Sequence, residues 1–185
     1  IEEHKFTRTE SGIFDVSHMG QLFIYGNEDL TNDLEKIFPL DLKKLKLNHS
    51  KYSFLMNNEA GIYDDLIITK IENGFLIILN AACKESDFKI LTKLLDNKYE
   101  MVLDEKRSLI AIQGPKSVAI LDDIVKGIEG LNFMSGNWFF FNDQKIYITR
   151  SGYTGEDGFE ISLTNELADK FTRKLIEKGA KLIRL

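Results

Sequence analysis

The segment GIYDDLIITKIENGFLIILNAACKESDFKILTKLLD, residues 61–96, contains two β-rich apolar runs and then a helical pattern. The runs at 63–71 and 74–80 have the length and the Ile-rich composition of strands. Residues 85–96 place apolar side chains three and four positions apart, which is the spacing of one helix face. The segment therefore predicts two strands followed by a helix.

The same criteria extend outward along the chain. Further strands are expected at 21–26, 51–57, 99–104, 108–114, 137–141, 145–150 and 158–163. Further helices are expected at 29–38, 116–125 and 166–179. For the last helix, Thr164 and Asn165 are candidate N-caps, and Gly179 is a typical residue to follow a helix end.

The predicted elements follow the order β-α-β-β-β-α-β over residues 20–104, and a similar order begins again over 108–185. This weak internal repeat predicts an α+β fold of two similar units, each an antiparallel sheet covered on one face by helices. A single larger α+β sheet is the alternative that the pattern leaves open.

Composition excludes several classes of protein. The 185 residues include 24 Lys+Arg and 29 Asp+Glu, and the net charge of −5 argues against nucleic acid as a partner. The apolar runs have strand length and are far shorter than the roughly 20 residues of a membrane span, so no membrane is expected as a partner. Cys83 is the only cysteine, which excludes an internal disulfide and suits a reducing compartment.

The usual catalytic templates are missing from the sequence. It has no glycine-rich phosphate loop and no G-x-S-x-G nucleophile motif. His4, His18 and His49 are widely spaced and match no metal-ligand pattern, so no metal site is predicted.

Polar residues at two strand positions are unusual. Asp64 and Asp65 lie inside an apolar strand, and because successive strand residues face opposite sides, one carboxylate is expected to face the core or a pocket and the other water. They are either ordinary strand-end aspartates or part of a site. Asn80 ends the next strand, and it is either the N-cap of the following helix or a site residue.

Two further segments combine polar residues with tight backbone. SGYTGEDGFE (151–160) has glycines that permit an irregular turn, flanked by Tyr153 and Glu160. A hairpin loop would explain it, but the two flanking side chains favour a site. FDVSHMGQ (14–21) by itself predicts only the start of a strand.

Taken in order, FDVSHMGQ, GIYDDLI (61–67), NAAC (80–83), LIAIQGP (109–115) and GYTGEDGFE (152–160) resemble the motif set of the aminomethyltransferase family, the T-protein of the glycine cleavage system. The resemblance covers nearly the whole chain. Two mild departures are Ala60, where the family often has glycine, and Cys83, where it often has asparagine.

The resemblance implies a fold and a reaction. Two α+β units would surround a channel for tetrahydrofolate, divided as an N-terminal helix at 1–15 that packs with the second unit, a first unit at 16–104 and a second at 105–185. A C-terminal β-barrel-like domain would be missing. The family reaction moves the aminomethyl group from the dihydrolipoyl arm of the H-protein to tetrahydrofolate, releases ammonia and yields 5,10-methylenetetrahydrofolate.

Site residues transfer from the resemblance motif by motif. Asp65 matches the catalytic carboxylate of the family. The tetrahydrofolate-binding positions matched by motif are Met19, Tyr52, Asn80, Tyr153 and Glu160. The resemblance implies tetrahydrofolate as co-substrate, lipoylated H-protein as partner and no metal.

Three alternatives remain open. Folate-binding relatives that assist iron–sulfur enzymes carry a K-G-C-Y-x-G-Q-E signature where this chain has SGYTGEDGFE, and they usually lack the Asp pair. Folate-dependent demethylases use the same scaffold. A plain interaction module would bind no folate.

Both ends of the sequence look cut, because it opens at IEEHKF without Met and stops at KLIRL. We therefore expect a fragment of a longer protein, with the arginine of a family G-A-R-D motif missing and Arg184 matching a later L-R-L arginine. Lys-, Asn- and Ile-rich composition favours a bacterial cytoplasm, or a mitochondrial matrix if a preceding segment held a transit peptide.

Overall fold

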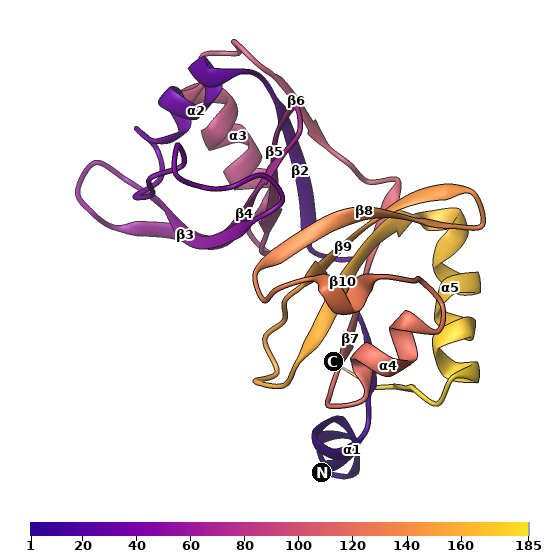
Figure 1. Ribbon diagram of the computed structural model, residues 1–185. Coiled ribbons are helices and arrows are strands. Elements are labelled where there is room, and N and C mark those ends of the chain that lie inside the picture. The colour runs from indigo at the N-terminus through magenta and orange to yellow at the C-terminus, as the bar shows by residue number, and fades with distance from the viewer. Residues whose placement is uncertain (185) are drawn as a thin grey trace. The chain divides into compact units, whose positions relative to one another are not determined.

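The computed structural model describes residues 1–184, and Leu185, the last residue of the predicted second unit, lies outside the described residues. The fold is α+β with two separate sheets, as the repeat predicted (Figure 1). The chain divides into a continuous unit, Met19–Glu105, and a discontinuous unit in which Ile1–His18 joins the chain from Lys106 onward.

The continuous unit contains an antiparallel sheet with the strand order β3-β4-β5-β2-β6. Its elements in chain order are β2 (Gly20–Tyr25), α2 (Glu28–Leu34), β3 (Ser50–Met56), β4 (Ile62–Ile71), β5 (Gly74–Leu79), α3 (Lys84–Leu94) and β6 (Glu100–Leu103). Both helices pack on one face of the sheet, with Leu30 and Leu34 of α2 and Leu91 of α3 in one core with the strands (Figure 1).

Alternation along β4 determines which of its side chains enter this core. Asp64, Leu66 and Ile68 are buried, whereas Asp65 and Ile67 are half-buried. This is the period of two that a half-buried strand requires. The paired aspartates therefore point to opposite faces of the sheet, as predicted.

The discontinuous unit contains a second sheet, which in residues 1–184 has the order β11-β1-β7-β10-β9-β8. Its elements are α1 (Glu2–Thr9), β1 (Gly12–Asp15), β7 (Arg107–Gln113), α4 (Ser117–Asp122), a 3₁₀ turn (Ile128–Gly130), β8 (Ser135–Phe141), β9 (Gln144–Arg150), β10 (Gly158–Thr164), α5 (Asn165–Glu177) and β11 (Lys181–Leu182). All strand pairs are antiparallel except β1 with β11.

The two sheets have the same plan. Adding five to each strand number of the continuous unit turns its order β3-β4-β5-β2-β6 into β8-β9-β10-β7-β11. The discontinuous unit has this order, with β1 inserted between β7 and β11. The internal repeat that the sequence suggested is therefore present in the strand topology.

Local differences from the predicted elements have identifiable causes. The helix expected at 29–38 ends at Leu34 and continues as turns up to Pro39, and a residue before proline is disfavoured in helical backbone. Thr164 is the N-cap residue of α5, although its hydroxyl donates to Gln144 Oε1 at 3.3 Å instead of capping. FDVSHMGQ spans the end of β1, a turn and the first residues of β2, so its interpretation as a strand start was incomplete.

Among residues 1–184, none of the helices combines the length and the apolar composition that a bilayer crossing requires.

Candidate functional site

Asn80 and the two aspartates form one hydrogen-bonded cluster in the continuous unit. The β4–β5 register pairs Leu66 with Leu79, so the next position along β5 brings Asn80 beside Asp65. Asn80 Nδ2 lies 3.0 Å from Asp64 Oδ1, from Asp65 Oδ1 and from the Asp65 backbone oxygen. The Asn80 backbone N–H also donates to Asp64 Oδ2 at 3.3 Å. One carboxamide thus holds two carboxylates that point to opposite faces of the sheet.

Tyr52 completes this cluster on the face of Asp65. It lies on β3 opposite Ile67, which makes Asp65 its diagonal neighbour across the strand pair. The Tyr52 hydroxyl donates to Asp65 Oδ2 at 2.9 Å, and this hydrogen bond raises the pKa of Tyr52. The Tyr52 side chain is 48% exposed, so the face that carries Asp65 includes accessible aromatic surface.

The alternative role of Asn80 as a helix cap is wrong for its side chain. Helix α3 begins at Lys84, and its N-cap residue is Cys83, which makes no side-chain cap. Asn80 contributes only its backbone oxygen to the turn before the helix, accepting from the N–H groups of Cys83 and Lys84. Its carboxamide is therefore committed to the aspartates.

Asp87 is a buried acid near this cluster that sequence analysis did not single out. It lies in α3, is 1% exposed, and its pKa is raised to about 7, first by burial and then by a hydrogen bond and charge interaction with Asp64. The pKa of the Cys83 thiol is also raised, mainly by burial and secondly by the negative charge of Asp64. The sequence signal was available, since Asp87 lies four residues before Leu91 and so shares the apolar face of the helix.

Glu160 is the corresponding buried acid of the discontinuous unit. It lies on β10 opposite Thr149 of β9 and is 9% exposed. The Ser151 hydroxyl donates to Glu160 Oε2 at 2.6 Å and lies 2.8 Å from Thr149 Oγ1. Burial raises the pKa of Glu160, and the hydrogen bond from Ser151 opposes part of that rise.

The glycine-rich loop before β10 is built around Gln113, at the end of β7. Gln113 is 1% exposed, donates from Nε2 to the Ser151 oxygen at 2.8 Å and accepts at Oε1 from the Thr154 hydroxyl at 2.9 Å. A side chain at Gly152 or Gly158 would collide with the Gln113 carboxamide. The glycines therefore allow the loop to close onto a buried glutamine, a role that the sequence did not reveal.

Charged pairs brace the outside of the same loop. Arg150 donates from Nε to Asp157 Oδ1 at 2.9 Å, and Arg8 of α1 pairs with Glu156 at 2.7 Å. Tyr153, at the tip, is 67% exposed. The loop thus presents an aromatic ring on a braced backbone.

The predicted site residues fall into both units. The continuous unit brings Tyr52, Asp65 and Asn80 into direct contact, and Met19 is half-buried in the turn before β2. The discontinuous unit holds Tyr153 and Glu160 at the two ends of the glycine-rich segment.

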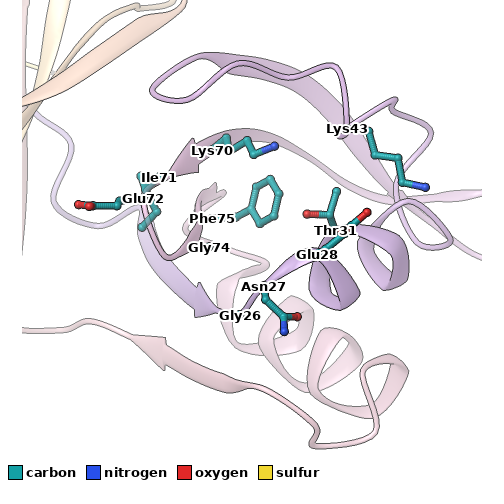
Figure 2. A pocket seen from close by; sticks show the side chains of 10 residues that line it. All are labelled: Gly26, Asn27, Glu28, Thr31, Lys43, Lys70, Ile71, Glu72, Gly74 and Phe75. Atoms are coloured by element: carbon teal, nitrogen blue, oxygen red, sulfur yellow. The ribbon is translucent and has the colours of Figure 1, made fainter.

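A cavity of about 440 Å³ in the continuous unit lies away from these residues. Figure 2 shows its lining, which includes Lys43, Lys70, Glu28, Glu72 and the ring of Phe75. It adjoins the first residues of β5, whereas Asn80 follows the last. This cavity and the polar cluster are therefore at opposite ends of the same strand.

Comparison with known proteins agrees with the motif resemblance. Residues 1–183 match the family described as the GCVT N-terminal domain. The chain is 43% identical over 178 residues to the probable mitochondrial aminomethyltransferase of Schizosaccharomyces pombe, covering 94% of this chain and 46% of that protein. It is 37% identical to the aminomethyltransferase of Thermoanaerobacter pseudethanolicus, covering 97% of this chain and 50% of the relative. Relatives thus occur in bacteria and in mitochondria.

A solved structure shows the same fold. The glycine cleavage system aminomethyltransferase T from Bartonella henselae superimposes with a TM-score of 0.88 at 38% identity, covering 98% of this chain and 50% of that chain. The present chain spans about half the length of the relatives it matches. With the family match extending over nearly all of its residues, the chain belongs to the GCVT N-terminal domain family.

Proposed function

We propose that the full-length protein containing this chain transfers an aminomethyl group from the dihydrolipoyl arm of an H-protein to tetrahydrofolate. The reaction releases ammonia and gives 5,10-methylenetetrahydrofolate. The names of the matched relatives and the family membership support this proposal. The observation that carries it is the Asp65 carboxylate, which Asn80 and Tyr52 hold on a paired strand.

The residues present fit tetrahydrofolate as a co-substrate. A pterin ring offers an amino group and a ring N–H side by side, and a carboxylate supplies matching acceptors. Glu160 is a buried carboxyl with one oxygen committed to Ser151. Tyr52 and Tyr153 offer exposed aromatic rings, and Met19 offers a polarizable thioether. The Asn80 Nδ2 is committed to the aspartates, so toward a heterocycle edge Asn80 can offer its carboxamide oxygen as an acceptor.

Asp65 is proposed as the catalytic carboxylate. Attack by the folate amine and loss of ammonia place positive charge near the reacting nitrogen, and a fixed carboxylate stabilises that charge. Two hydrogen-bond donors hold Asp65 without neutralising it: Asn80 Nδ2 at Oδ1 and the Tyr52 hydroxyl at Oδ2. A carboxylate oriented in advance in this way costs little reorganisation during reaction.

The test uses the full-length protein with tetrahydrofolate and aminomethylated H-protein, and assays methylenetetrahydrofolate and ammonia. We expect Asp65→Asn to lower kcat by about 10² to 10⁴-fold while the Kd for tetrahydrofolate changes only a few-fold. Asp96→Asn, an exposed aspartate of the same unit, is the matched control and should behave as wild type.

Each other outcome would identify a different function. Near-normal transfer by Asp65→Asn would remove the catalytic assignment. Folate binding by the wild-type protein without ammonia release would indicate a binding protein that assists other enzymes, and methyl-group removal from a glycine derivative would indicate a demethylase. No folate binding would leave an interaction module.

A further inference from the structure

The proposed function leaves one buried acid of the continuous unit without a role. Asp87 is 1% exposed on the sheet-facing side of α3, and its Oδ2 has no hydrogen-bond partner among the described residues. An ionised carboxylate buried without a donor is costly. Its protonation state therefore matters for the structure around it.

The groups that face Asp87 explain how this cost is avoided. The Asp64 carboxyl of β4 lies within hydrogen-bond reach, and the Cys83 thiol interacts with both acids from the turn before α3. Two carboxyl groups can hydrogen bond to each other only when one carries a proton. Burial and the charge of Asp64 together raise the pKa of Asp87 to about 7, which places that proton on Asp87 below neutral pH.

Asp64 links this proton to the other face of the sheet. Asp64 Oδ1 accepts from Asn80 Nδ2 at 3.0 Å, and the same nitrogen donates to Asp65 Oδ1 at 3.0 Å. A carboxamide nitrogen has only two N–H bonds, so its three acceptors at this distance share them. A shift of the Asp64 carboxylate therefore changes how Asn80 holds Asp65.

We propose that Asp87 is a positioning residue which, as a carboxylic acid donating to Asp64, fixes Asn80 and through it the Asp65 carboxylate for one-carbon transfer. The inference rests on the proposed function for its catalytic consequence, but not for the shared proton itself. Loss of the proton leaves Asp64 and Asp87 as adjacent buried carboxylates, and their repulsion displaces the acceptor that anchors Asn80.

The shared proton is tested in the full-length protein by infrared spectroscopy, without any substrate. We expect a protonated carboxylic acid band that disappears with a midpoint near pH 7 in the wild type and in Asp96→Asn, the exposed control. Asp87→Asn keeps the shape and a donor N–H, and it keeps the buried Glu160 carboxyl, whose pKa is also raised. The wild-type-minus-Asp87→Asn difference spectrum should therefore contain an acid band that titrates near pH 7. A difference spectrum without this band would overturn the proposal whatever the protein catalyses.

The positioning role is tested by the pH dependence of transfer. An amide donates to Asp64 at every pH, so the ratio of wild-type to Asp87→Asn kcat should fall about 10- to 30-fold between pH 6 and 8.5, following loss of the proton from Asp87. If the infrared result is as expected but the kcat ratio stays constant between about pH 6 and 8.5, the shared proton is supported and the positioning role of Asp87 is rejected. A protein with the infrared band but no transfer at any pH would overturn the proposed function instead.

Discussion

The Asn80 side chain holds both aspartates of β4 in place. Its carboxamide reaches carboxylates on both faces of a sheet, which is possible because it lies one position beyond the paired end of β5. From the sequence, helix capping and a site role were equally reasonable for this residue. Only the register between β4 and β5 distinguishes them, and register depends on contacts between strands that composition does not encode.

Glu160 leads to a prediction about the pH dependence of folate binding. Binding the donors of a pterin edge requires the ionised carboxylate, and burial raises the pKa of Glu160. Affinity should therefore be complete above that raised pKa and should be lost as the pH falls through it. Glu160→Gln should weaken tetrahydrofolate binding by about 10- to 100-fold at pH values above that raised pKa and remove the pH dependence.

Calorimetric titration of the full-length protein at several pH values measures this effect. Glu166→Gln removes an exposed glutamate at the start of α5 and serves as the control. Unchanged affinity in Glu160→Gln would mean that the pterin edge is read by another residue.

At the element scale, periodicity predicted most strands and helices within a few residues, because their apolar spacing follows from burying one face. Along β4, buried and half-buried side chains alternate as the sequence pattern predicted, and Asp64 is buried whereas its neighbour Asp65 is half-buried. The loop at 151–158 was predicted only as a tight turn. Its organising residue, Gln113, lies 38 positions before Ser151, so no local pattern could connect them.

Gly152 provides a direct test of this loop. Its φ of +152° is rare for residues with side chains, and an alanine methyl group would collide with the Gln113 carboxamide. We expect Gly152→Ala to lower the free energy of unfolding by roughly 1 to 3 kcal/mol, because the loop must open or Gln113 must lose its bonds.

Urea unfolding measures the change in stability. Gly130→Ala is the matched control, since a methyl group there meets open space, and it should change stability by less than about 0.5 kcal/mol. Equal stability of Gly152→Ala and Gly130→Ala would show that the loop does not depend on its contact with Gln113.

At the scale of the whole molecule, the repeat explains the architecture, but one copy is built from a continuous segment of the chain and the other from two separate segments. All five strands of the first sheet come from Met19–Glu105. The second sheet takes β1 from the other side of that segment and places it between β7 and β11. The sequence suggested the repeat, but it did not reveal this insertion, because β1 has no counterpart in the first copy.

This difference predicts that the first unit folds as an isolated peptide and that the second does not fold without β1. A peptide of residues 19–105 contains every strand and the complete core of its unit, so it should unfold cooperatively in urea and give a dispersed amide NMR spectrum. A peptide of residues 106–185 lacks β1 and leaves one edge of β7 unpaired, so it should fold only when a peptide of residues 1–18 is added. A non-cooperative 19–105 peptide, or a 106–185 peptide that folds alone, would contradict this prediction.

The insertion of β1 also has a consequence for synthesis on the ribosome. The strand leaves the exit tunnel before the continuous unit, but β7, its antiparallel partner, follows only after that whole unit has been made. At typical translation rates this delay is roughly 5 to 20 s, which is ample time for the intervening unit to collapse first. During that interval β1 remains an unpaired strand, and it is a segment on which a ribosome-associated chaperone would have reason to act.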